Sequence, residues 1–585
     1  MNTLHDTPPL GGTSILHAHC VDSGLPVVIP PGCSVMLDWG RKRTGKVVLA
    51  GRGTLTYAYG ASPELLALAA GELDLPLNAG HPTWVGGRPA GILTLMEDGA
   101  VLHDPIAALR WLRLTNTSTR PARLTAATLL PSEAPCSPSG SFSCSDPALD
   151  QAWRMGIDTV HLCTQPGTES LVPVFAPFGS KHVQWDGCRR DREIWGGDLR
   201  AGSLAWLYNF TDHDPIANSL YLIMSAQHND CSEHGLFPGS GSTHLTFYEW
   251  AFWEVVALWE YHLHTGDRRL LPFAAHALPK FLAWCERRFE EGPDGWIHGG
   301  GSWMYTLKFE RQAQPSLQAV AAIALPALAS LFDALADPAR AARCRALRDR
   351  LTQRFHAAFF DPGLEAYRFL NQDPGGAPRS DLCTNAWAIT ADLAPAALRS
   401  GILAALARNH RTPSGSLNLA PAYPDNPASH NIWVWPYANA YEMVARLHAG
   451  DATGALDLLR SYTAPIAAHG QHTLYEAMTP EGGMPLAGHP YGTLSLCHAW
   501  AALGSWALQR YILGVAPTAP GWSSFAVDPV ASPLTWAQGT VVTPKGPIEI
   551  ELETTDGRLA GRIRYPKSLQ PPADIQKGLR LESYA

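Results

Sequence analysis

The middle of the chain, from about residue 145 to residue 515, repeats apolar residues at steps of three and four positions. This spacing places the apolar side chains on one face of an α-helix. An Asp-Pro pair at Asp146 marks a helix start, and loops with Gly and Pro separate the repeats. Successive amphipathic helices predict stacked helical hairpins, which can close into a toroid with its long loops at one end. The predicted helices cover residues 146–165, 250–266, 270–291, 315–335, 339–359, 383–393, 436–450, 452–470 and 493–514.

The two ends of the chain follow a strand-like pattern instead. Residues 45–60 and 109–130 contain short runs of β-branched and aromatic residues between turn signals. Residues 544–566 read as a hairpin with TDG at the turn, and residues 133–147 resemble a linker. The predicted fold class is therefore mainly α and multidomain. We expect an N-terminal β-sandwich in 1–140, a helical domain in 145–515 and a small β-domain in 516–585.

Composition and charge narrow the function classes. The net charge is −8 at pH 7 with no long basic run, so no basic face for nucleic acid is implied. The 11 cysteines lack the paired spacing of a zinc site, which favours free thiols in a reducing compartment. We find neither a signal-peptide pattern nor a run of about 18 apolar residues. We expect a cytoplasmic protein without nucleic-acid or membrane partners, either as a monomer or as a homodimer.

One short stretch concentrates charged and aromatic side chains. Residues 185–198, WDGCRRDREIWGGD, contain four acids, three arginines, two tryptophans and three glycines. This mixture predicts a loop that leads into a helix, where functional sites are often built. Clustered carboxylates separate one another's pKa values, so one can stay protonated while arginines keep the others ionised. A surface salt-bridge loop is the alternative, and the two tryptophans argue against it. The acids are Asp186, Asp191, Glu193 and Asp198.

A second constellation surrounds Glu476. It follows an aromatic residue, and a Gly- and Pro-rich loop runs from it to a predicted helix with His498 and Trp500. Such a glutamate can line a cleft, although a lone loop glutamate is more often solvated. The 20 tryptophans favour either ordinary core packing or an aromatic-lined cleft for sugar rings. For Trp250 and Trp303, at loop-to-helix positions, core packing competes with ligand contact.

Two carboxyl groups on either side of a sugar bond are the minimal machinery of glycoside hydrolysis. One group protonates the leaving oxygen, and the other activates water or attacks the sugar. No Gly-rich phosphate loop or dinucleotide fingerprint competes with this interpretation.

The acidic stretch also resembles a known family. Residues 186–198 resemble the D-G/C-x-x-R-(D/E)-x-x-x-W-x-G-D signature of bacterial α-L-rhamnosidases, glycoside hydrolase family 78. TLYE followed by GTLSLCHAW is similar to that family's second active-site segment, and residues 511–530 are similar to its passage into the C-terminal β-domain. The resemblance covers about residues 145–585. It implies an (α/α)6 barrel flanked by β-sandwich domains, and inverting hydrolysis of terminal α-L-rhamnosides in small glycosides or oligosaccharides.

The resemblance implies a role for each matched position. Asp191 matches the general acid and Glu476 the general base. Many family members carry Glu as the acid, with one more residue before the tryptophan, so Glu193 stays a rival of Asp191. The implied mechanism needs no metal or organic cofactor. The positions that match or fit sugar contacts are Asp186, Arg190, Trp195, Asp198, Trp250, Trp303 and His498.

Two other hypotheses stay open. A helical-barrel glycosidase of this kind could act on another sugar, as a glucosidase, a trehalase-like enzyme or an unsaturated glucuronidase does. A non-catalytic sugar-binding or sensing protein could use the same scaffold. Such a protein would bind rhamnose without ever releasing it from a glycoside, and a panel of aryl glycosides separates all three hypotheses.

We predict that Asp191→Asn and Glu476→Gln each remove most turnover of p-nitrophenyl α-L-rhamnopyranoside while the protein stays folded. The neutral amides keep the size of the side chains but can neither donate nor accept the catalytic proton. Release of p-nitrophenol measures kcat, and circular dichroism checks the fold. A variant that keeps a kcat near that of the wild type shows that the role assigned to its residue is wrong.

Overall fold

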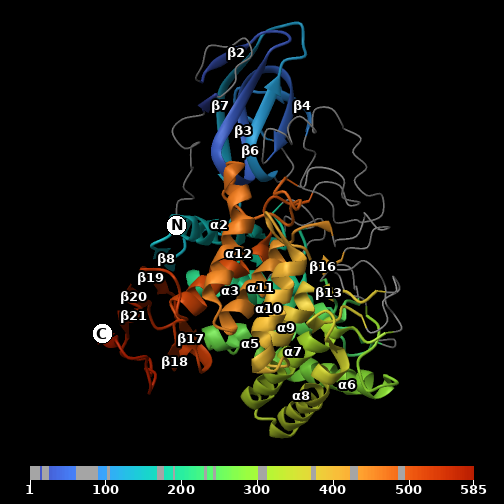
Figure 1. Cartoon of the computed structure of the whole chain (residues 1–585). Coiled ribbons are helices and arrows are strands. Elements are labelled where there is room, and N and C mark those ends of the chain that lie inside the picture. The colour runs from blue at the N-terminus through green and yellow to red at the C-terminus, as the bar shows by residue number, and fades with distance from the viewer. Residues whose placement is uncertain are drawn as a thin grey trace.

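The protein is described here by a computed structural model. In Figure 1 the N-terminal strands stand at one end of a helical body, and the C-terminal strands lie along its side. The described residues are 14–15, 25–60, 90–101, 106–167, 177–188, 192–229, 233–240, 246–300, 312–370, 377–421, 432–484 and 494–585.

A seven-stranded sheet forms the N-terminal part. The long strand β3 dominates it, since both of its ends pair with β6 and its middle pairs with β7. This sheet has a hydrophobic core of its own, separate from that of the helices. The strands predicted within 45–60 and 109–130 are confirmed. The strands are β1 (Ser14–Ile15), β2 (Val27–Ile29), β3 (Ser34–Gly60), β4 (Ala90–Leu95), β5 (Ala100–Val101), β6 (Ile106–Thr115) and β7 (Ala122–Pro131).

The helices predicted between residues 146 and 470 are all present, α3 is the helix expected after the acidic stretch, and α4 and α10 add to them. Asp146 caps α2 as expected, because its side chain accepts a hydrogen bond from the Ala148 N–H at 2.9 Å. The helices are α2 (Pro147–Cys163), α3 (Gly196–Asn209), α4 (Asp214–Ser225), α5 (Tyr248–Thr265), α6 (Leu271–Glu291), α7 (Pro315–Ala334), α8 (Pro338–Phe359), α9 (Leu382–Thr390), α10 (Ala396–His410), α11 (Pro436–His448) and α12 (Ala452–Ala468).

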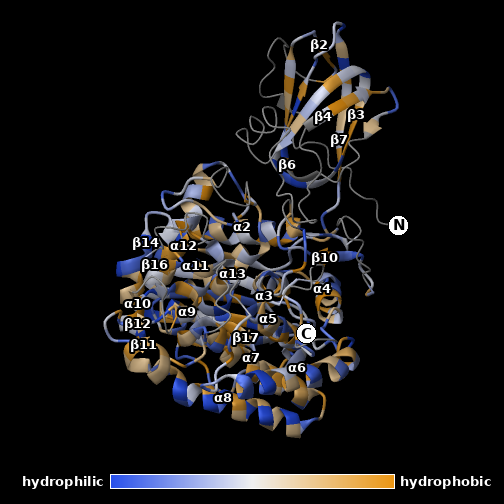
Figure 2. Ribbon diagram, turned by 90° about the vertical axis from the view of Figure 1, so that its right-hand side faces the viewer, coloured by the Kyte–Doolittle hydropathy of each residue, from blue (hydrophilic) through white to orange (hydrophobic). Residues whose placement is uncertain are grey.

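Two helices illustrate the two kinds of helical pattern. α8 lies at the edge of the body and carries both hydrophobic and hydrophilic residues (Figure 2). Its buried residues include Cys344, Leu347 and Leu351, which recur at steps of three and four. Every residue of α3 is buried, so it has no polar face and no periodic pattern to find. α7 is, among the described residues, the one helix long and apolar enough to cross a membrane. This corrects the expectation that no such run exists, although most of α7 is buried inside the protein, as in a core helix.

The helix predicted for 493–514 begins later than expected. Ser495 to His498 are non-helical, and Ser495 and His498 hydrogen-bond to the segment around Glu476, which draws their backbone out of a helix. Short helical turns follow from Ala499: η4 (Ala499–Ala502), α13 (Leu503–Ala507) and the π-helix η5 (Leu508–Ile512). The remaining short strands of the helical region are β9 (Thr164–Pro166), β10 (His182–Gln184), β11 (Phe360–Asp361), β12 (Ala366–Tyr367), β13 (Ser380–Asp381), β14 (Arg411–Thr412), β15 (Gly415–Ser416) and β16 (Leu419–Ala420).

The C-terminal strands form a five-stranded sheet in the order β22-β21-β20-β19-β8. Its edge strand β8 comes from the predicted linker, far earlier in the chain. The predicted hairpin is confirmed, and Asp556 and Gly557 have positive φ angles of 50° and 71° at its turn. This sheet shares one hydrophobic core with the helices. The elements are β8 (Ser141–Cys144), β17 (Val515–Pro517), η6 (Pro520–Trp522), β18 (Phe525–Val527), β19 (Trp536–Val541), β20 (Ile548–Thr555), β21 (Arg558–Pro566) and β22 (Leu579–Tyr584).

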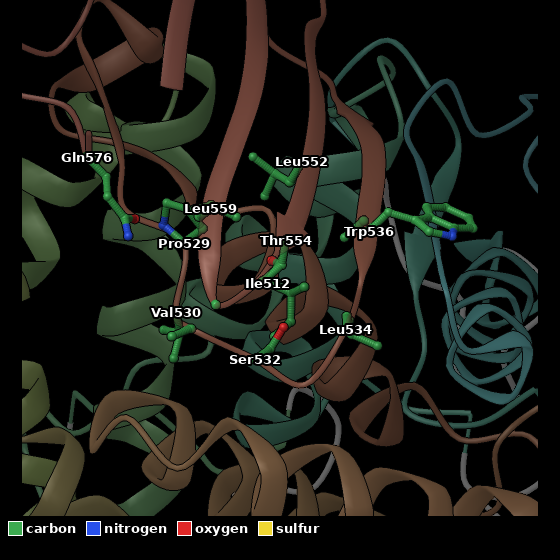
Figure 3. Close-up of a pocket in the computed structure, with 13 residues that line it drawn as sticks. Ile512, Pro529, Val530, Ser532, Leu534, Trp536, Leu552, Thr554, Leu559 and Gln576 are labelled. Atoms are coloured by element: carbon green, nitrogen blue, oxygen red, sulfur yellow. The ribbon is translucent and has the colours of Figure 1, made fainter. Parts of the chain in front are cut away.

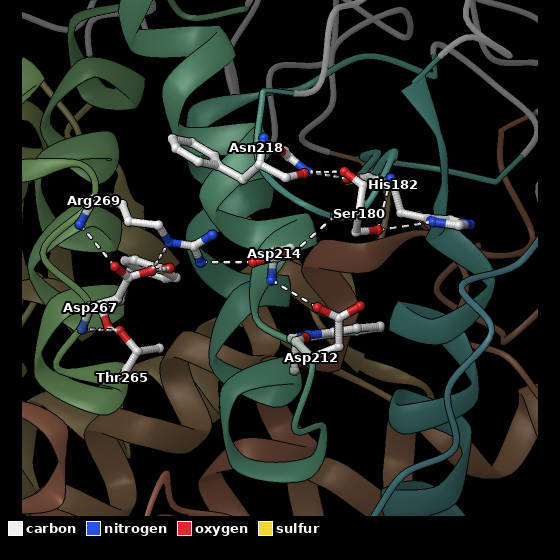
Figure 4. A network of polar contacts seen from close by, with 11 residues as sticks. Ser180, His182, Asp212, Asp214, Asn218, Thr265, Asp267 and Arg269 are labelled. Carbon is white, nitrogen blue, oxygen red and sulfur yellow. Dashed lines mark hydrogen bonds and ion pairs between the residues drawn. The ribbon is translucent and has the colours of Figure 1, made fainter.

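A polar network fixes the strand that leads into the acidic stretch (Figure 4). Asp214, at the N-terminus of α4, accepts hydrogen bonds from the Ser180 N–H at 3.1 Å and from Arg269 at 2.7 Å. Asn218, one turn later, donates to the carbonyl oxygens of Ser180 and His182 at 2.8 and 3.0 Å. β10 is thereby held against α4 just before residue 185.

We predict that Gln509→Leu destabilises the protein, because Gln509 joins α3 to both β8 and β19. Its amide donates to Asn209, to the Ser141 carbonyl and to the Thr540 carbonyl, and it accepts from Asn209 at 2.9 Å. Leucine leaves these buried groups unsatisfied, at a cost of about 2 kcal/mol or more. Urea unfolding measures the loss. Gln538→Leu, at an exposed position of β19, is the matched control, and equal midpoints for the two variants would refute the prediction.

Candidate active site

The acidic stretch and the segment around His498 lie side by side, although about 300 residues separate them. The Ala499 N–H donates to the Asp186 carbonyl at 2.6 Å, and the Cys188 N–H donates to the Cys497 carbonyl at 3.2 Å. A β-bridge joins Gly187 to His498. The two motifs found in the sequence therefore belong to one place in the fold.

His498 stands between two carboxylates. Its Nε2 lies 2.9 Å from Asp198 Oδ1, and its Nδ1 lies 3.7 Å from Glu476 Oε2. All three side chains are at most 4% exposed. The Ser495 N–H donates to the same Glu476 oxygen at 2.7 Å. Because burial removes water from these groups, each contact fixes the orientation of the next side chain along the row.

Asp186 and Glu193 are hydrogen-bonded to each other. The Glu193 N–H donates to Asp186 Oδ1 at 3.0 Å, and the Asp186 N–H donates to the Glu193 carbonyl at 2.9 Å. The Glu193 carboxylate accepts a hydrogen bond from the Ser240 hydroxyl. Arg192 has a positive φ of 53° and donates to Gln165 at 2.8 Å. One carboxylate oxygen of Asp186 is thus bound to the Glu193 backbone.

Two glycines bring α3 close to Trp250. A Cβ atom on Gly197 would lie 2.6 Å from the Trp250 ring, and one on Gly196 would lie 2.6 Å from the Trp250 carbonyl oxygen. Only glycine therefore permits this approach. It places Asp198 in the first turn of α3, where the helix dipole favours a negative charge. Trp250 is fully buried, and its ring centroid lies 5.8 Å from that of Tyr437.

The structure brings most of the predicted residues together, and their roles remain predictions. Trp195 precedes α3 and packs against Phe247, with ring centroids 6.2 Å apart. Among the described residues, no cluster of His, Cys, Asp and Glu could hold a metal ion. Arg190, Asp191 and Trp303 lie outside the described residues. The predicted residues that the described region places around this site are Asp186, Glu193, Trp195, Asp198, Trp250, Glu476 and His498.

The sequence interpretation missed two polar side chains here. Ser240 contacts Glu193 across 47 positions, and nothing in its local sequence indicates this contact. Glu254 lies within an apolar helix, one turn after Trp250, and an acid in such a run is a recognisable signal. Its side chain lies beside Gly196, so it sits directly behind the start of α3.

A separate cavity of about 290 Å³ opens at the C-terminal sheet (Figure 3). None of the residues that line it has an ionisable side chain, so it offers no acid–base chemistry. The Trp536 indole points away from the other lining residues in Figure 3. The lining residues include Ile512, Val530, Leu552, Thr554, Leu559 and Gln576.

Two family models match the chain. Residues 137–418 match the bacterial α-L-rhamnosidase six-hairpin glycosidase domain, and residues 514–570 match the bacterial α-L-rhamnosidase C-terminal domain. No curated protein matches the chain.

Solved structures share the fold at low sequence identity. The family 78 rhamnosidase of Bacillus sp. GL1 aligns at 22% identity and a TM-score of 0.72, over 95% of this chain and 55% of that one. A Klebsiella oxytoca rhamnosidase with bound rhamnose aligns at 18% identity and a TM-score of 0.62, over 85% of this chain and 94% of that one. The Streptomyces avermitilis α-L-rhamnosidase in complex with L-rhamnose aligns at 17% identity and a TM-score of 0.64, over 94% of this chain and 50% of that one. The chain thus spans about half the length of two of these three structures.

We predict that Glu254→Gln changes how stability depends on pH. Both carboxyl oxygens of Glu254 are buried without a hydrogen-bond partner among the described residues, and burial raises the pKa of this carboxyl well above its ordinary value. Above the unfolded-state pKa of about 4.5, the unfolded chain loses this proton while the folded protein keeps it. Folding stability then falls with rising pH, by up to about 1.4 kcal/mol per pH unit.

Glutamine removes this proton linkage. The stability of Glu254→Gln relative to the wild type should therefore rise between pH 5 and pH 8, as measured by urea unfolding. Glu290→Gln, at an exposed position of α6, is the matched control for the change from Glu to Gln. A pH-independent difference for Glu254→Gln would contradict the prediction.

Proposed function

Because the chain belongs to the bacterial α-L-rhamnosidase family, we propose that it is a glycoside hydrolase that releases terminal L-rhamnose from α-L-rhamnosides. The two family models together match more than half of its residues. The proposed substrates are small glycosides or oligosaccharides. Hydrolysis proceeds with inversion at the anomeric carbon and uses no metal or organic cofactor, and the proposed location is the cytoplasm.

The row Asp198, His498 and Glu476 carries this proposal. It joins the acidic stretch to the second motif through contacts of 2.9 and 3.7 Å in a buried place. Carboxyl groups from two separate segments are what acid–base cleavage of a glycoside needs. Asp191 lies in sequence between Asp186 and Glu193, which hydrogen-bond to each other, and the Asp186 carbonyl accepts a hydrogen bond from the Ala499 N–H, next to His498.

The finer architecture belongs to the same proposal. We place the helices of 145–515 in an (α/α)6 barrel, with β-sandwich domains on either side in 1–140 and 516–585. The match to a six-hairpin glycosidase domain and the succession of paired helices support this arrangement. The row of carboxylates and imidazole then lies at the mouth of the barrel.

In the proposed mechanism, Asp191 protonates the glycosidic oxygen, and ionised Glu476 deprotonates a water on the opposite face of the ring. Inversion leaves room for that water, with the two carboxyl groups about 6.5–9.5 Å apart. Glu193 uses its backbone to hold Asp186 and its carboxylate to hold Ser240, which favours Asp191 over Glu193 as the acid. The proposed sugar contacts are Asp186, Arg190, Trp195, Asp198, Trp250, Trp303 and His498.

We predict that the wild-type protein hydrolyses p-nitrophenyl α-L-rhamnopyranoside and that the first product is β-L-rhamnose. Attack of water from the face opposite the leaving group inverts the anomeric carbon. Proton NMR of the anomeric signals in the first minutes distinguishes this product from the α-anomer. Initial release of α-L-rhamnose would refute inversion. Cleavage only of other aryl glycosides would refute rhamnose as the sugar and keep the reaction class.

The same assay identifies the acid. A variant without its general acid loses least activity on substrates whose leaving group needs little protonation. Asp191→Asn should therefore retain much more of the wild-type rate on a 2,4-dinitrophenyl rhamnoside than on an alkyl rhamnoside. Glu193→Gln is the matched comparison and should show similar losses on both. The reverse result would assign the acid to Glu193.

A further inference from the structure

Lys42 of the N-terminal sheet reaches into the helical body. It lies in a bulged part of β3, where β3 advances five positions, from Asp38 to Arg43, against two positions of β6. Bulges turn side chains away from the regular alternation of a strand. Lys42 is fully buried, whereas Lys46, four positions later in the same strand, is exposed.

The ammonium group of Lys42 joins two segments of the candidate active site. Its Nζ donates to the Thr473 hydroxyl at 2.5 Å and to the Leu496 carbonyl at 2.6 Å. The Thr473 hydroxyl in turn donates to the same Leu496 carbonyl at 2.8 Å. Nζ also lies 5.6 Å from the centre of the Tyr475 ring, within the range of a cation–π contact.

These two segments carry the carboxylate and the imidazole of the site. Two backbone hydrogen bonds connect them: the Glu476 N–H donates to the Ser495 carbonyl at 2.8 Å, and the His498 N–H donates to the Leu474 carbonyl at 3.1 Å. These bonds set how the side chains of Glu476 and His498 lie relative to each other. Lys42, from the N-terminal sheet, contacts both of these paired segments.

The charge of Lys42 is costly at this position. Burial lowers its pKa to about 8, and among the described residues no carboxylate lies within ion-pair distance of it. A buried charge without a counter-ion destabilises a fold unless dipoles replace its water. Here the Thr473 hydroxyl and the Leu496 carbonyl replace that water, so these two paired segments stabilise the charge.

We propose that Lys42 is a positioning residue that sets the geometry between Glu476 and His498. The proposal rests on the proposed function in that Glu476 acts as the base. Lys42 touches neither the sugar nor the reacting atoms. It holds Thr473 and Leu496, three and two positions before Glu476 and His498, so the N-terminal sheet becomes a working part of the site.

Four variants test this proposal. Lys42→Met keeps a long side chain without donors, and Lys42→Arg keeps donors. Thr473→Val removes the hydroxyl at the other end of the contact. Arg110→Met is the matched control, because Arg110 donates from the same sheet to the Gly470 carbonyl at 2.9 Å, and no described contact joins it to Thr473 or Leu496. It removes this contact and the ion pair with Asp38, and leaves the bonds of Lys42 in place.

Lys42→Met should lower kcat about 10- to 100-fold, because small displacements of a catalytic group are costly, while KM changes less than about threefold. Thr473→Val should lower kcat in the same direction, Lys42→Arg should recover part of the loss, and Arg110→Met should stay within about threefold of the wild type. The kcat of each variant is compared with that of the wild type on a glycoside that the wild type hydrolyses. The test therefore stays valid if the substrate sugar is not rhamnose.

Hydrogen exchange gives a readout independent of turnover. The backbone amides of 474–476 and 495–498 should exchange faster in Lys42→Met and Thr473→Val than in the wild type. Their exchange rates should not change in Arg110→Met. If the wild type hydrolyses no glycoside, the proposed function fails while this measurement still decides the role of Lys42. The proposal is overturned if Lys42→Met keeps wild-type kcat and exchange, or if Arg110→Met loses as much kcat as Lys42→Met.

Discussion

The candidate site depends on the imidazole of His498. Its ring joins the start of α3, through Asp198, to the segment that carries Glu476. Other features around it support the same geometry. The glycines before Asp198 let α3 approach Trp250, and the pairing of residues 495–498 with 474–476 turns the ring toward Glu476. Such contacts are strong where they are buried, so the loss of one partner strongly destabilises the fold.

The sequence predicts well those features that are local. α8 is visible from its apolar spacing, α2 from Asp146, and the turn of the C-terminal hairpin from Asp556 and Gly557. The acidic stretch and Glu476 stand out because charged and aromatic residues are rare together in a core. Residues 185–198 were correctly expected to lead into a helix.

Features that depend on residues far away in the sequence could not be predicted from local patterns. α3 is buried all round, so its own residues show no periodicity. Residues 495–498 were expected to be helical, and their hydrogen bonds to the Glu476 segment keep them out of a helix. Ser240 and Lys42 look ordinary in their local sequence, since their roles arise from residues 47 and more than 400 positions away. The region around Asp191 lies outside the described residues, so its predicted role rests on the motif.

The placement of β8 has a consequence for biosynthesis. Cys144 in β8 pairs with Ala537 in β19, almost four hundred residues later. At a synthesis rate of about 5–20 residues per second, β8 waits roughly 20 to 80 seconds for its partner strand. Because the C-terminal sheet and the helices share one hydrophobic core, this core cannot be completed during the interval. The N-terminal sheet, with a core of its own, has no such delay and can be complete while the ribosome is still translating the helices.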